Sequence, residues 1–254
     1  MRHYVAFLKK ELTENTRTYK LLIMLSVFAI FGIMSPLTAK LTPDILNAFM
    51  PEEISITIPE PSAFDSYAQF FSNVSQMGLI VTVIVFSGII GNELSKGTLI
   101  NMLTKGMSRA AVMLSKYTSM ALIWTASYAV SFFITLGYTI YLFPDDKVEN
   151  LMFSVFNLWL FGMFLLALLL FSAALVNNNY GSMLITGAAV VAMMLCNIHP
   201  DAHKYNPLSL SSKSMELITG TSAVSSLYAP VWISIGLLVI LTALTVMVFR
   251  KKQV

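Results

Sequence analysis

Two short stretches of the chain carry residue types that could do chemistry. The first, GNELSKGT, is the nearest approach to a phosphate loop, but Lys96 stands where that motif needs its second glycine, and no strand precedes it. The second, HPDAH, offers His199, Asp201 and His203 as metal ligands. Pro200 and the lack of further ligands argue against a metal site there. We therefore expect no catalytic residue, metal or cofactor in this chain.

The composition is that of a membrane protein. Hydrophobic residues make up 56% of the 254 residues and charged residues 11%, against about 25% charged in soluble domains. A helix needs about 20 apolar residues to cross a bilayer, and six segments qualify. We expect an all-α polytopic protein with one transmembrane domain over residues 1–254. The predicted spans cover about 21–39, 70–91, 110–143, 151–176, 180–198 and 229–249.

These spans contain no Asp, Glu, Lys, Arg or His deep within them. Ionisable residues at membrane depth are the usual mark of proton relays and ion-coupled transport. An intramembrane enzyme would need a nucleophile beside a base, or a metal set. The sequence therefore disfavours a secondary transporter and an enzyme, and any transport would draw its energy from elsewhere.

The distribution of charge predicts the orientation. Twelve of the 16 Lys and Arg residues lie in residues 1–20, 92–118 and 250–254, and ten of the 13 Asp and Glu residues lie in the other connections. The positive-inside rule places both termini in the cytoplasm, and six spans require the same parity. Residues 40–69 and 199–228 are then extracellular. The small net charge of +3 suggests no nucleic-acid partner.

Residues 92–109 form a predicted cytoplasmic loop with a helix of about two turns. Gly97 and Gly106 bracket it, Thr98 is a candidate N-cap, and Ser108 is a candidate cap for the next helix. So short a helix is marginal in water and needs a surface to rest on. That surface is either the lipid headgroups or a groove on a cytoplasmic partner. Its apolar face comprises Leu99, Ile100, Met102 and Leu103.

The same loop resembles that of the ABC type-2 permease family, the membrane subunits of ABC exporters. Members read E-x-x-x-G-T-L, then leucines, a turn, S-R, and a lysine about seven residues later. This chain departs from the pattern at the turn, where Gly106–Met107 replaces a common proline. The N-terminal sequence FLKKELTENTR also resembles the family's opening. The matching positions are Glu93, Gly97–Thr98–Leu99, Leu103, Ser108–Arg109 and Lys116.

The resemblance implies that residues 92–109 hold a coupling helix seated in a groove of a separate ATP-binding subunit. Two ATPase copies, which bind ATP and Mg, would assemble with this chain and a second copy or close paralogue. Glu93 and Arg109 would pair with each other or contact the ATPase. The residues implied in coupling are Glu93, Gly97, Thr98, Leu99, Ile100, Leu103, Arg109 and Lys116.

Two further helices are predicted outside the spans. Residues 1–20 place Tyr4, Phe7, Leu8 and Leu12 on one face, as in an amphipathic helix lying in the headgroup plane, and the resemblance adds contact with the ATPase as a second role. Outside the first span, TPDILNAFM predicts a short helix capped at Thr42.

The third span carries a polar and aromatic stripe at helical spacing. Such a stripe lines a substrate pathway or packs against neighbouring helices, where Ser and Thr are common. Both interpretations stay open at this stage. The stripe comprises Thr125, Tyr128, Ser131, Thr135 and Tyr138.

We expect the permease subunit of an ABC exporter in a bacterial cytoplasmic membrane. Its cargo would be amphipathic or hydrophobic: a peptide such as an antimicrobial or cytolytic peptide is favoured, and a drug or lipid-like molecule is the other option. The alternatives are a sensory or assembly subunit that transports nothing and an ATP-independent channel.

Overall fold

The computed structural model describes residues 2–49, 60–95, 97–98, 102, 104, 106–144, 146, 148–176, 178–199 and 202–251. Every regular element among these residues is helical. The elements are α1 (Arg2–Arg17), α2 (Lys20–Phe49), α3 (Ala63–Asn73), η1 (Val74–Gly78), α4 (Leu79–Phe86), α5 (Gly91–Ser95), α7 (Arg109–Leu142), α8 (Leu151–Val176), α9 (Asn179–Cys196), η2 (Ala202–Lys204), α10 (Ser209–Ser212), α11 (Ser214–Ile218), η3 (Val224–Leu227) and α12 (Tyr228–Lys251).

Six helical stretches in the described part of the chain are long and apolar enough to cross a membrane. The prediction of six such helices is confirmed. The second stretch runs from Ala63 to Ser95 and so begins before the predicted residue 70. A capping box starts it, because the Asp65 carboxylate accepts a hydrogen bond from the Ser62 backbone N–H at 2.9 Å. Within it, η1 is a single π-helical turn.

The first membrane helix continues past its predicted end at residue 39. Helix α2 contains Pro36 and Pro43, and Thr42 donates to the Thr38 carbonyl within the helix instead of capping a separate one. Pro36 has no N–H for the Gly32 carbonyl, four residues earlier. Thr135 of α7 donates to that carbonyl at 3.1 Å. A neighbouring helix thus satisfies the freed backbone group, which lets the helix pass through the proline.

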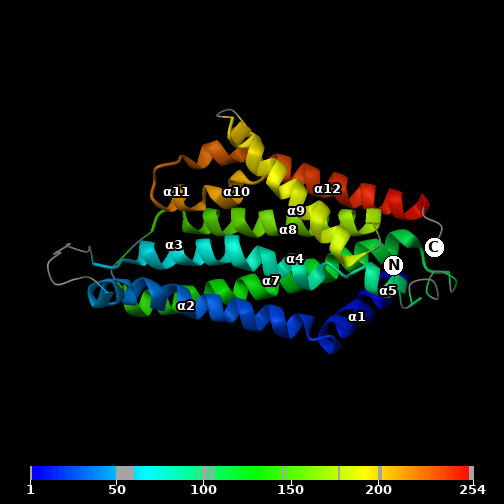
Figure 1. Ribbon diagram of the computed structural model, residues 1–254, viewed down its shortest axis with the longest axis horizontal. Coiled ribbons are helices and arrows are strands. Elements are labelled where there is room, and N and C mark those ends of the chain that lie inside the picture. The colour runs from blue at the N-terminus through cyan, green and yellow to red at the C-terminus, as the bar shows by residue number, and fades with distance from the viewer. Residues whose placement is uncertain are drawn as a thin grey trace.

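The helices form an elongated bundle in which α2 lies along α7 and α12 lies along α8 (Figure 1). Helix α8 is the most buried of the six and is apolar on all sides. Trp124 of α7 is fully buried against it, and its indole N–H donates to the Trp159 carbonyl at 3.1 Å. A Cβ on Gly162 would lie 2.1 Å from that indole, so only glycine fits.

Both labelled termini and α5 lie at one end of the bundle (Figure 1). We call this the inner end, because the charge distribution predicts it to be cytoplasmic. The short helices α10 and α11 lie toward the other, outer end. The structure therefore agrees with six crossings, while the side of the membrane that each end faces stays a prediction.

Candidate functional site

Five charged side chains from three helices meet at the inner end. This ionic cluster comprises Lys10, Glu11 and Glu14 of α1, Glu93 of α5 and Lys116 of α7. Lys116 Nζ lies 2.6 Å from Glu93 Oε2 and 3.1 Å from Glu11 Oε1. Lys10 Nζ contacts Glu93 Oε1 and lies 3.1 Å from Glu11 Oε1 and 2.6 Å from Glu14 Oε2. The cluster therefore ties the root of the 92–109 loop to α1 and α7.

The centre of the ionic cluster is shielded from solvent. The Lys116 side chain is 1% exposed, Glu11 3% and Glu93 5%, whereas Lys10 is 29% exposed. Burial acts to lower the pKa of Lys10, but Glu11, Glu14 and Glu93 outweigh it and raise that pKa above its usual value. Oxygen atoms of these three carboxylates lie within 4.8 Å of one another. The Lys10 ammonium contacts all three carboxylates and Lys116 contacts Glu11 and Glu93, so two protein cations already pair with this carboxylate group.

Helix α1 reaches this position by packing directly on α7. Its buried face has Phe7, Glu11 and Asn15 at four-residue spacing. The Tyr4 hydroxyl lies 2.7 Å from the Thr118 hydroxyl. The sequence predicts a helix in the headgroup plane with Tyr4, Phe7, Leu8 and Leu12 on its apolar face. The structure instead buries Glu11, because α7 offers it a lysine.

The 92–109 loop has the backbone features that its glycines predict. Gly97 and Gly106 have φ of +66° and +84°, the left-handed region that favours glycine. After Gly106, the Met107 N–H donates to the Met102 carbonyl at 3.4 Å, as at a helix C-terminus closed by a Schellman motif. Ser108 caps α7, accepting from the Ala111 N–H at 3.2 Å. The predicted seating residues Leu99, Ile100 and Leu103 lie outside the described residues.

The structure adds two contacts at this loop. The Thr98 hydroxyl donates to the Glu93 carbonyl at 3.2 Å, and the residues whose N–H groups it would cap lie outside the described part of the chain. Glu93 pairs with the lysines of the ionic cluster, and contact of Glu93 and Arg109 with the ATPase stays a prediction. Arg109 donates to the Phe249 and Arg250 carbonyls, at 2.9 and 3.0 Å, where a cation is favoured at the end of α12.

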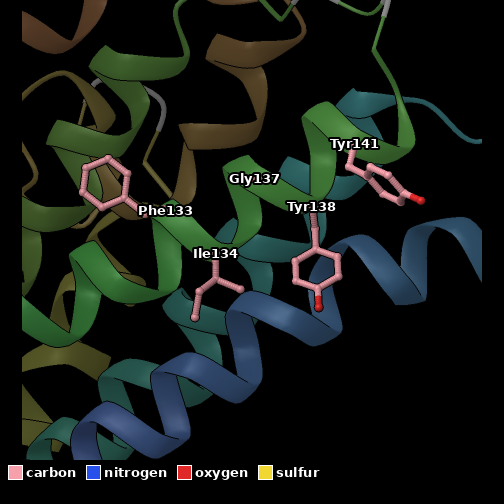
Figure 2. A pocket seen from close by; sticks show the side chains of 5 residues that line it. All are labelled: Phe133, Ile134, Gly137, Tyr138 and Tyr141. Atoms are coloured by element: carbon pink, nitrogen blue, oxygen red, sulfur yellow. The ribbon is translucent and has the colours of Figure 1, made fainter.

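Most residues of the polar stripe on the third span lie where α7 contacts neighbouring helices. Tyr128 and Thr135 are buried and donate to carbonyls of α8 and α2, at 2.9 and 3.1 Å, and Ser131 is buried between them. Thr125 accepts from the Trp159 indole at 3.0 Å. Tyr138 is 42% exposed and stands on the outer surface of α7 beside the α2 ribbon (Figure 2). The structure supports packing for the buried members, and a pathway role for the stripe stays a prediction.

A large apolar groove lies away from the third-span stripe, and the sequence did not predict it. This membrane groove has a volume of about 680 Å³ and runs between η1 and α4 on one side and α9 on the other, with α8 and α10 completing its walls. Most of its lining is aliphatic, and a few polar groups, including Gln76 and Ser211, line it as well. The π-helical turn at its edge was a feature that no residue pattern signalled.

The comparisons agree with a membrane protein and go no further. No family model matches the chain. It is 20% identical, over 259 aligned residues covering 100% of this chain and 99% of the relative, to the "Uncharacterized transmembrane protein YxlG" of Bacillus subtilis (strain 168). Six membrane-length helices and this full-length similarity to a transmembrane protein indicate that the chain is a multi-pass membrane protein.

Proposed function

We propose that the chain is the permease subunit of an ATP-driven ABC exporter and works with a separate ATP-binding subunit in a bacterial cytoplasmic membrane. The ionic cluster is the observation that carries this proposal. It fastens the root of the 92–109 loop to two other helices through buried ion pairs. A force applied to the loop would therefore move α1, α5 and α7 together.

The loop is built to present a surface. Gly97 and Gly106 have left-handed backbone on the two sides of the predicted short helix, and Ser108 restarts the chain as the cap of α7. Arg109 also links this restart to the end of α12. A partner seated on the loop would thus act on two membrane helices that begin or end there. A loop that only rested on lipid headgroups would not require this anchoring.

The membrane groove supports an amphipathic or hydrophobic cargo. Its walls are apolar, its few polar groups are uncharged, and its volume falls in the range of pockets that hold small organic ligands. A peptide with apolar side chains is the favoured cargo, and a drug or lipid-like molecule fits the same chemistry. We place cargo contact in this groove in preference to the third-span stripe, whose buried members already bond to neighbouring helices.

Co-purification tests the proposal. The tagged full chain is extracted in mild detergent from the membranes of its own host, and captured proteins are searched for a Walker-type ATP-binding subunit. We expect capture together with ATPase activity. Leu99→Glu with Leu103→Glu should abolish capture, because two carboxylates would be buried in the partner's groove.

The matched control places the same two charges at the outer end. Tyr205 and Met215 are exposed apolar residues there, and Tyr205→Glu with Met215→Glu should leave capture unchanged. Failure of the wild-type chain to capture any ATP-binding subunit would favour a sensory subunit or a channel. Equal capture by both double variants would refute the coupling role of the loop.

A further inference from the structure

The membrane groove is closed at its inner end by direct contact between helices. Its innermost lining residues are Ile84 on α4 and Met183 on α9. One residue further inward on α9, the Ser182 hydroxyl donates to the Ser87 carbonyl at 2.9 Å, and this contact is buried. Helix α9 runs away from this contact toward the outer end (Figure 1). The Ser182–Ser87 contact therefore lies next to the innermost lining residues of the groove.

A second contact lies one turn beyond the first. The Asn179 side-chain N–H donates to the Asn92 side-chain carbonyl at 2.8 Å. Gly88 lies under this pair: a Cβ there would be 2.5 Å from Asn92 Nδ2 and 2.9 Å from Asn179 Nδ2. The amides can meet only because residue 88 has no side chain. We call Ser87, Asn92, Asn179 and Ser182 the inner clasp.

Helix α5 carries one residue of the inner clasp and one residue of the ionic cluster. Asn92 bonds to α9, and the next residue, Glu93, pairs with Lys10 and Lys116. Successive residues point about 100° apart around a helix, so one short helix holds different neighbours on different faces. The chain at 87–90 between α4 and α5 is a turn, which separates α5 from the regular helix above it. Movement of α5 would thus reach α9 through Asn92.

We propose that the inner clasp is a gate that closes the membrane groove toward the inner end, and that displacement of α5 opens it. The proposal rests on the proposed function, since it supplies the route by which the 92–109 loop controls access to the groove. The chemistry suits a contact that must break and re-form. Both amides are neutral, and the Asn92–Asn179 bond is exposed, so water can replace each partner when they separate.

Thiol labelling tests the gate without ATP or cargo. Cys196 is the single cysteine, so Met183→Cys in a Cys196→Ser chain gives one reporter at the inner end of the groove. Inside-out membrane vesicles are treated with a membrane-impermeant maleimide. Removing one hydrogen bond of average net strength shifts an equilibrium about fivefold. We expect Asn179→Ala to raise the labelling rate by about that factor. Gly88→Ala, which keeps both amides but displaces them, should also raise it.

The matched control is an amide pair just beyond the outer end of α9, where Asn197 is the C-cap. Asn197 accepts a hydrogen bond from Asn206 at 2.7 Å, and Asn197→Ala should leave the rate unchanged. Unchanged labelling in both clasp variants would overturn the gate, and so would an equal rise in Asn197→Ala, which would indicate general loosening. This result is separate from the exporter test, which depends on capture of an ATP-binding subunit.

Discussion

Replacing Lys116 with methionine should destabilise the protein strongly. The change removes the cation that lies 2.6 Å from Glu93 and 3.1 Å from Glu11, at a position that is 1% exposed. Removing one partner of a buried ion pair costs roughly 3–5 kcal/mol, because the remaining charge stays buried without compensation. Lys10 still contacts both carboxylates, so we expect a loss near the lower limit, about 3 kcal/mol.

The assay is the free energy of unfolding from a denaturant titration of the purified chain in mixed micelles. Lys9→Met is the matched control, because Lys9 lies on α1 beside the cluster but is exposed. Its replacement should change the free energy of unfolding by less than about 0.5 kcal/mol. Adding Glu93→Gln to Lys116→Met should cost less than the sum of the single changes, since the two groups interact. Equal losses for Lys116→Met and Lys9→Met, or strict additivity with Glu93→Gln, would refute a buried, coupled cluster.

Three further predictions concern packing, backbone satisfaction and pH. Gly162→Ala should lower the free energy of unfolding by about 1–3 kcal/mol in the same titration, because the Trp124 indole fills the space that the new methyl group would need. Gly236→Ala should leave it unchanged, because a Cβ there meets nothing within 4 Å. Thr135→Val should lower the free energy of unfolding by about 1–2 kcal/mol in the wild type. In a Pro36→Ala chain the loss should be almost zero, because the restored N–H of residue 36 can bond the Gly32 carbonyl. Equal losses in both chains would contradict this account. Because the pKa of Lys10 is raised above 10.5 in the folded state, its stabilisation is present below that pH and is lost only as pH rises through the raised pKa. The difference between wild type and Lys10→Met should therefore stay constant from about pH 6 to about pH 9, and a steady change across that range would contradict the raised pKa.

Local features of this protein could be predicted from the sequence because their causes are local. Long apolar runs indicate membrane helices whatever their neighbours are. A glycine beside a short helical stretch indicates a left-handed turn, as found at Gly97 and Gly106. A serine before a long helix indicates an N-cap, as found at Ser108. Each of these rules needs only a few neighbouring residues.

The ionic cluster could not be predicted in the same way. Two of its five ion pairs join residues 83 and 105 positions apart in the chain, and composition alone gives no reason to bring these residues together. One signal was present: Glu11 and Asn15 follow Phe7 at four-residue spacing, which places polar groups on the face that an amphipathic interpretation assigns to lipid. A second was Lys116, which lies two turns into the third membrane helix and is its one charged residue after Arg109. Together these two signals indicate a buried carboxylate on α1 that pairs with a lysine on α7.

The polar stripe and the proline of the first membrane helix are best understood as one feature. A proline in a membrane helix frees a carbonyl four residues earlier, and hydrocarbon offers that carbonyl no water. A hydroxyl on a neighbouring helix then becomes a structural requirement, as Thr135 is for the carbonyl of Gly32. Gly32 allows this approach, because a Cβ there would lie 2.7 Å from the Ser131 carbonyl oxygen. A threonine in a membrane helix is therefore evidence for a substrate pathway only if its hydroxyl does not already donate to a carbonyl that a proline has freed in a neighbouring helix. Once Thr135 is matched in this way, the membrane groove between α4 and α9 becomes the stronger candidate for cargo contact.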